Sequence, residues 1–135
     1  MEYKSLREKI SAEKKEREAR YLAYSRLLQE AWRAGMMAAT QYKPRPMLVT
    51  DEAGTILDRV DDGPCGFAWV NVPGNTSFGK WLKKNNLARD DYPKGLCIWI
   101  SDHNQSYERK RVHANAMALY LSDNGIVCSA RGRLD

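Results

Sequence analysis

The chain has 135 residues, of which 43% are hydrophobic and 29% charged, as in an ordinary globular domain with one core. It lacks the run of about 18 apolar residues that a membrane-spanning helix needs, and its charged start lacks the apolar segment of a signal peptide. We therefore expect neither a membrane span nor export. The formal net charge of +5 allows contact with nucleic acid or an acidic protein but requires neither.

The cysteines and histidines do not form a metal-binding pattern. Cys65, Cys97 and Cys128 have no CxxC spacing, so we expect small buried thiols in a reducing cytoplasm. His103 and His113 do not complete a set of metal ligands with them. A glycine-rich phosphate loop is also missing. The sequence thus predicts no metal and no cofactor.

Residues 2–37 are predicted to form one long helix. Residues 7–20 contain no Gly or Pro, and almost all of them favour or tolerate helix. Residues 13–20 offer almost nothing to bury, whereas the following segment carries an apolar stripe made of Tyr21, Tyr24, Leu27, Leu28, Ala31 and Trp32. The helix should therefore dock at its second half and project at its first. The projecting half could be solvated, or it could pair with a second copy or another partner.

The chain after this helix is predicted to be an α+β domain. The segment 35–45 should loosen the chain, and Pro44 and Pro46 should close off the helix, which divides the chain into a helical arm (1–37), a linker (38–46) and a domain (47–135). The predicted elements of the domain are a β-hairpin (47–50 and 55–60), strands at 66–72, 97–100 and 126–130, and helices at 77–86 and after Ser106, followed by a basic tail (131–135). We expect the β-α-β-α-β part to form one small mixed sheet with helices packed on it.

The last helix has clear local signals. Ser106 or Asn104 can cap its start, and Gly125 can take the left-handed conformation after its end. Its apolar stripe is predicted to contain Val112, Ala116 and Leu119, with His113, Met117 and Tyr120 beside it.

Two strand-to-helix turns resemble each other and define the predicted site. Each joins a Trp-containing strand to an Asn-x-Ser-aromatic sequence at a helix start. If the two strands are parallel neighbours, both turns lie at one sheet edge, where free helix amides can bind a ligand. Helix capping is an equally simple explanation of these residues. The candidate binding residues are Asn75, Ser77, Ser101, Asp102, His103, Asn104, Ser106, Arg109, Lys110 and Arg111.

Catalytic signals are weak. Ser101, Asp102 and His103 are adjacent in sequence, so their side chains point apart and cannot form a nucleophile-base relay by themselves. We therefore assign no catalytic residue and favour a protein that is not an enzyme. A positive surface with Trp81 and Tyr107 as stacking groups would instead favour nucleic acid. It would draw on Lys80, Lys83, Lys84, Arg109, Lys110, Arg111, Arg131 and Arg133.

Four segments resemble small uncharacterised proteins encoded by tailed bacteriophages. They are residues 63–70 (GPCGFAWV), 78–84 (FGKWLKK), 98–110 (IWISDHNQSYERK) and 130–135 (ARGRLD), so the resemblance covers about residues 63–135 and leaves out the N-terminal helix. It implies a setting, the cytoplasm of an infected bacterium or the virion. It implies no activity and no binding residue.

We accordingly expect a phage-type accessory protein that binds a macromolecule. A host protein is the favoured partner, which would make the chain a host-takeover or anti-defence factor. It could instead be a minor virion protein that self-associates through the N-terminal helix. A third possibility is a nucleic-acid-binding protein, and a fourth is a small enzyme or nucleotide binder that uses the 101–106 turn.

Overall fold

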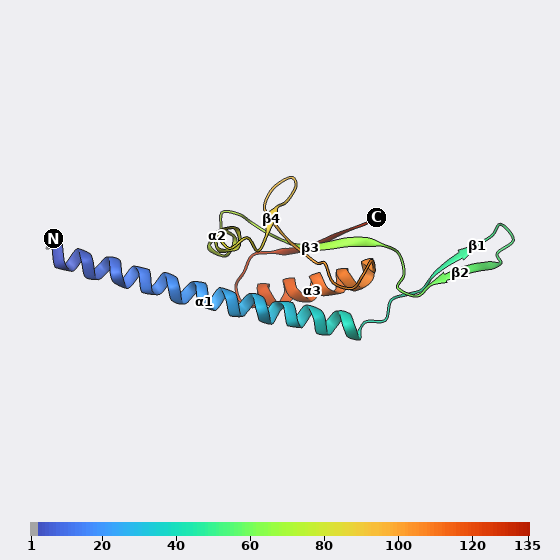
Figure 1. The fold of residues 1–135 in the computed structure, drawn as a ribbon, viewed down its shortest axis with the longest axis horizontal. Helices are drawn as coiled ribbons and strands as arrows, with labels where there is room; N and C mark the ends of the chain where they lie inside the picture. Colours follow the sequence, from blue (N-terminus) through green and yellow to red (C-terminus); the bar gives the residue numbers. More distant parts are fainter. Residues whose placement is uncertain (1–2) are drawn as a thin grey trace.

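The computed structural model describes residues 3–135 and confirms an α+β fold (Figure 1). Its elements in chain order are α1 (Tyr3–Gln41), β1 (Met47–Thr50), β2 (Ile56–Val60), β3 (Gly66–Val72), α2 (Ser77–Lys84), β4 (Arg89–Asp90), β5 (Leu96–Trp99), α3 (Tyr107–Asp123) and β6 (Ser129–Leu134). The strands form a hairpin and a separate four-stranded sheet. Within residues 3–135, none of the helices has the length and apolar character needed to cross a membrane.

The four-stranded sheet has the order β4-β5-β3-β6, and all of its neighbouring strands are antiparallel. The predicted mixed sheet is therefore wrong. The reason is β4, a two-residue strand in a segment that was predicted to be a loop. The chain turns back after β4, where Gly95 takes a φ of +92° and its carbonyl accepts a hydrogen bond from the amide of Asp91 at 2.9 Å. As a result β5 runs against both β4 and β3.

The sheet, α3 and α1 are stacked as successive layers (Figure 1). Side chains of β3 and β5 that face α3, such as Val70 and Ile98, are buried together with Met117 and Leu121. The buried face of α3 is therefore not the predicted stripe, since Leu119 is 64% exposed. Helical periodicity allowed several neighbouring stripes, and only the position of the sheet selects one of them.

Helix α1 continues to Gln41, past the predicted end at residue 37. Residues 5–20 are exposed all round, whereas Ala31 and Ala39 are completely buried. Gly35 lies between these alanines at helical spacing, where an added Cβ would overlap the imidazole of His113. Gly35 thus permits close packing of α1 on α3, and the helix continues to Gln41 through a segment where the chain was expected to loosen.

The predicted β-hairpin is confirmed. Its strands pair with Met47 opposite Val60 and Thr50 opposite Ile56, with an irregularity after Val49. The turn is held by Asp51, whose Oδ1 accepts hydrogen bonds from the amides of Ala53 and Thr55. The hairpin projects from the end of the molecule opposite to the start of α1 (Figure 1).

The predicted basic tail (131–135) is wrong, because residues 131–134 belong to β6 and pair with β3. Arg131 lies opposite Trp69, and Arg133 lies opposite Phe67. Gly132 between them faces α3, where a side chain would meet Tyr107 and Arg111. The alternation Arg-Gly-Arg therefore follows the two-residue repeat of a strand.

Candidate functional site

The ten predicted binding residues do not form one surface. Asn75 and Ser77 follow the end of β3, and residues 101–106 follow the end of β5. Because β3 and β5 are antiparallel, the end of β3 at Val72 lies beside the start of β5 at Leu96. The two turns that follow these strands therefore lie at opposite ends of the strands. The expected single ligand-binding edge is thus wrong, since it required parallel strands.

Helix capping accounts for part of the predicted set. Thr76, rather than Asn75 or Ser77, caps α2, and its Oγ1 accepts a hydrogen bond from the amide of Gly79 at 3.0 Å. The predicted cap Ser106 is confirmed at α3, where its Oγ accepts from the amide of Arg109 at 3.3 Å. Ser106 also donates to the carbonyl of Asp62 at 2.8 Å and is 1% exposed, so it holds the fold and offers nothing to a ligand.

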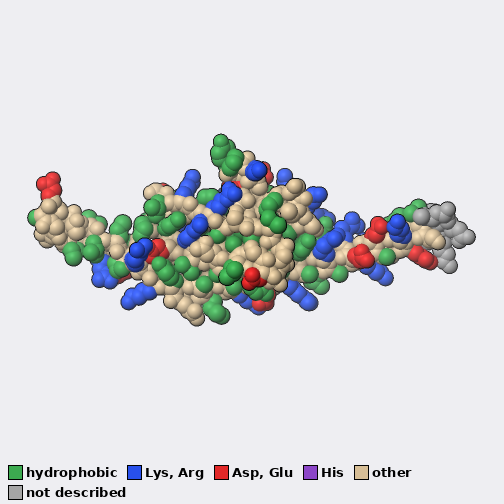
Figure 2. All heavy atoms as spheres, turned by 180° about the vertical axis from the view of Figure 1, so that it is seen from behind, with side chains coloured by type: hydrophobic (Ala, Val, Ile, Leu, Met, Phe, Trp, Pro, Cys, Tyr) green, Lys and Arg blue, Asp and Glu red, His purple; other side chains and the backbone are tan. Residues whose placement is uncertain are grey.

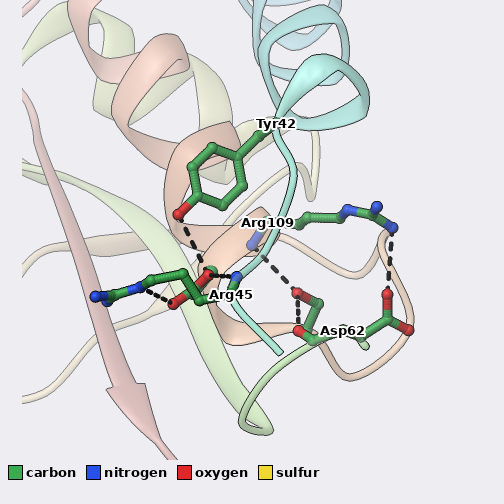
Figure 3. A network of polar contacts seen from close by, with 6 residues as sticks. Tyr42, Arg45, Asp62 and Arg109 are labelled. Atoms are coloured by element: carbon green, nitrogen blue, oxygen red, sulfur yellow. Dashed lines mark hydrogen bonds and ion pairs between the residues drawn. The ribbon is translucent and has the colours of Figure 1, made fainter. Parts of the chain in front are cut away.

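The first turn of α3 joins two distant segments of the chain (Figure 3). Glu108 accepts hydrogen bonds from the Tyr42 hydroxyl at 3.2 Å and from the Arg45 amide and Nε at 2.8 and 3.3 Å. The bond from the Arg45 amide is the main reason that the pKa of Glu108 lies below its usual value. Arg109 pairs with Asp62 at 3.4 Å. Glu108 and Arg109 therefore fix the segments before and after the hairpin.

The remaining basic residues of the predicted set are also held by the fold. Lys110 is 4% exposed, and its Nζ donates to the carbonyl of Gly66 at 3.4 Å. Arg111 is partly buried, and its Cδ lies 3.2 Å from where a Cβ on Gly132 would stand. Lys110 is consequently not available on the surface, whereas Arg109 and Arg111 remain partly exposed.

His103 and His113 form a hydrogen-bonded pair, with 2.8 Å between Nε2 of His103 and Nδ1 of His113. His113 is fully buried against the ring of Trp32, and burial lowers its pKa to about 4. Burial also lowers the pKa of His103, so both rings are neutral at pH 7 and link the 101–106 turn to α3. Ser101 and Asn104 are exposed, whereas Asp102 is partly buried. Across residues 3–135, His, Cys, Asp and Glu form no cluster of three that could hold a metal ion.

A different surface, the outer face of the four-stranded sheet, gathers aromatic rings and arginines. Directly opposed residues of antiparallel strands point to the same face, and Trp69 stands opposite both Trp99 and Arg131. Phe67 and Arg133 belong to the same face by their pairing and two-residue spacing. We call this surface the aromatic sheet face and define it as Phe67, Trp69, Arg89, Trp99, Arg131 and Arg133.

The three rings of the aromatic sheet face lie on the two central strands. Trp69 and Trp99 are stacked with 5.7 Å between ring centroids, and Phe67 lies 5.4 Å from Trp99. The guanidinium of Arg89 lies over Trp99 at 5.1 Å, and that of Arg133 lies over Phe67 at 5.4 Å. All three rings remain partly exposed. The surface therefore combines flat π faces with positive charge.

Asp91 orients the indole of Trp69 on this surface. Its Oδ2 accepts hydrogen bonds from Nε1 of Trp69 at 2.9 Å and from Nδ2 of Asn71 at 2.7 Å. The turn beyond Asp91 presents Tyr92, which is 90% exposed. Asp91 and Tyr92, together with Trp69 and Trp99, border an open hollow of about 530 Å³. The indole of Trp69 is thus held in place beside a space that a flat ligand could enter.

The aromatic sheet face was not predicted from the sequence, and one of the two predicted stacking groups, Trp81, lies in the core. Trp81 is 5% exposed and packs against Tyr24 and Phe78 in the core. The signal that could have identified the surface was the two-residue repeat, which Phe67 and Trp69 share with Arg131 and Arg133. Without the register of β3 and β6, nothing indicated that these repeats were neighbours.

The fold and the surface together define a small α+β protein with helices on one face of an antiparallel sheet and an aromatic, arginine-flanked outer face. Comparisons with protein-family models, curated proteins and solved structures gave no match.

Proposed function

We propose that the protein binds single-stranded nucleic acid on the aromatic sheet face. The observation that carries this proposal is the placement of Phe67, Trp69 and Trp99 on the two central strands with arginines on both edge strands. Unpaired bases stack on aromatic side chains, and arginines neutralise the phosphates between them. Both kinds of contact are available on one continuous surface.

A single strand fits this surface better than a duplex. The base faces of a duplex are covered by neighbouring base pairs, so they are closed to Trp69 or Trp99, whereas a single strand exposes them. Helices α1 and α3 lie on the opposite face of the sheet, so neither is placed here to enter a major groove. Stacking is tolerant of base identity, so we expect weak sequence preference.

In this proposal, Arg89 and Arg133 move from the aromatic rings to phosphates when nucleic acid binds. Arg89 and Arg133 cover the rings of Trp99 and Phe67 in the free protein. An incoming base would take the ring face, and the guanidinium would move to a phosphate. Because each guanidinium exchanges its contact with a ring for a contact with a phosphate, the free-energy cost of uncovering the ring is small. Arg131 would supply a further phosphate contact from the same strand.

A protein partner is the alternative outcome. Trp, Tyr and Arg are also the residues that dominate protein interfaces, and the sequence favoured a host protein. The two partners differ in salt dependence, because phosphate neutralisation releases counterions from the nucleic acid. A partner that survives nuclease treatment and depends on the aromatic sheet face would replace nucleic acid in our proposal. The phage setting stays a prediction that rests on the sequence resemblance.

The test is fluorescence anisotropy with labelled single-stranded DNA and RNA oligonucleotides at several salt concentrations. Trp99→Leu keeps an apolar side chain but removes the stacking plane, and Tyr92→Ala alters an exposed ring without touching the core. We expect each to weaken binding by about 5-fold to 100-fold, the range for loss of one stacked base. The double change Arg131→Ala and Arg133→Ala should lower the salt slope by about 1.4, because each phosphate contact to a single strand contributes about 0.7.

The matched control is Lys80→Ala with Lys83→Ala, which removes the same charge from α2. It should change affinity far less than the arginine pair. Melting curves should show that each variant is folded. The proposal fails if the protein binds no oligonucleotide at low salt, or if Trp99→Leu and Tyr92→Ala both bind as well as the unaltered chain.

A further inference from the structure

The hairpin β1-β2 exposes apolar side chains on both of its faces. Met47, Leu48 and Val49 on β1 are exposed, and Ile56 and Leu57 on β2 are 60% and 64% exposed. A two-stranded hairpin without a packed face is only marginally stable in water, and both of its edges are free to pair. Several exposed apolar side chains on one small hairpin favour an interaction surface.

The charge of the hairpin limits what can cover it. Residues 47–62 contain five acidic residues and one basic residue, a formal charge of −4. Pairing of two hairpins would bring these acids together, which is unfavourable. The partner surface should therefore be apolar and basic.

The first part of α1 has this complementary character. Residues 5–26 contain seven basic and four acidic residues, a formal charge of +3. Leu6, Ile10 and Leu22 are exposed there, the last of them beside an open hollow of about 340 Å³ that Leu27 and Tyr120 also line. Glu13 and Arg17, like Glu16 and Arg20, are four residues apart, a spacing that favours helix, so this segment can present its surface as a preformed helix. We call residues 5–26 the arm.

The hairpin and the arm project from opposite ends of the molecule (Figures 1 and 2). The hairpin of one chain thus cannot reach its own arm, and their contact must join two copies. Such a contact uses a different surface on each copy, so it leaves a free hairpin at one end and a free arm at the other. Further copies can add at both ends.

We propose that the protein self-associates head to tail, with the hairpin of one copy docked on the arm of the next. Val49, which lies opposite Asp58 and shares its face of the hairpin, would cover apolar side chains of the arm such as Ile10, and Glu52 and Asp58 would face its lysines and arginines. This contact leaves the aromatic sheet face open. It does not rest on the proposed nucleic-acid binding.

The test is sedimentation velocity on the nuclease-treated full chain over a concentration series. The sedimentation coefficient of the unaltered protein should rise with concentration, to values that correspond to species larger than a dimer. The hairpin variant Glu52→Lys with Asp58→Lys changes the hairpin charge to about zero, and the arm variant Lys14→Glu with Arg17→Glu makes the arm slightly acidic. Each variant alone should associate at least about tenfold more weakly than the unaltered chain.

Mixing the two variants gives the sharpest result. The arm variant still has an acidic hairpin and the hairpin variant still has a basic arm, so one contact can form between them. We expect a 1:1 dimer that does not grow, because the other two surfaces are no longer complementary. A mixture that stays monomeric would overturn the proposal, as would an unaltered chain that is monomeric throughout the series.

Two further variants control for helix loss and for net charge. Ile10→Gln keeps good helix propensity and removes one apolar contact, and it should also weaken association. Asp90→Lys with Asp102→Lys makes the same charge change as the hairpin variant but on the body of the molecule, and it should associate like the unaltered chain. Equal loss of association in this control would show that net charge, and not the hairpin, governs assembly, and would overturn the proposal.

Discussion

Replacement of Gly35 by Ala tests whether the contact between α1 and α3 is as tight as the structure indicates. In an isolated helix this change is favourable by about 1 kcal/mol. Here the new Cβ would overlap Cδ2 of His113 and lie 2.6 Å from its Nε2. The ring is fully buried, hydrogen-bonded to His103 and packed against Trp32, so it has little room to turn away.

The two effects have opposite signs and can be separated. Overpacking of a held core side chain costs about 3 kcal/mol at the upper end of its usual range. After the gain in helix propensity, Gly35→Ala should lower the free energy of unfolding by about 2 kcal/mol. In a His113→Ala background the overlap is gone, and the same substitution should raise the free energy of unfolding by about 1 kcal/mol.

Urea unfolding of the four proteins at pH 7, followed by circular dichroism, measures this double-mutant cycle. The coupling free energy between the two positions should be about 3 kcal/mol, which is large for a contacting pair. If Gly35→Ala has the same sign in both backgrounds, the close approach of α1 to His113 is not what makes glycine necessary, and the reasoning is refuted.

Three further predictions concern the groups around the start of α3. The folded state holds His113 neutral down to about pH 4, whereas the unfolded chain takes up a proton below about pH 6.5, so the free energy of unfolding should fall by about 2 kcal/mol between pH 7 and pH 5. Urea midpoints should show this fall, and His113→Ala should flatten it. Glu108→Gln weakens the bonds from Tyr42 and Arg45 and should cost about 1 to 2 kcal/mol, with faster hydrogen exchange at the Arg45 amide. Ser106→Ala removes a cap and a buried bond and should lower the urea midpoint by the equivalent of about 1 to 2 kcal/mol; an unchanged midpoint would contradict that role.

The sequence by itself determined the local elements. The absence of Gly and Pro from residues 7–20 indicated a helix, and a turn beginning at Asp51 indicated the hairpin. Ser106 was expected as a possible cap of α3, and Gly125, with a φ of +85°, ends that helix as expected. Each of these features depends on residues only a few positions apart, so local propensity and capping chemistry are enough to predict it.

Only the tertiary structure decided how these elements combine. The direction of β5 depends on β4, which has two residues and is too short to show a periodic pattern. That direction separated Asn75 from Ser101, so the two turns do not form one surface. The buried face of α3 and the role of Gly35 depend likewise on contacts between distant segments. Pairing and packing are set by long-range register, which local propensity does not determine. The aromatic sheet face exists for the same reason, because it is assembled from four strands that are separated along the chain.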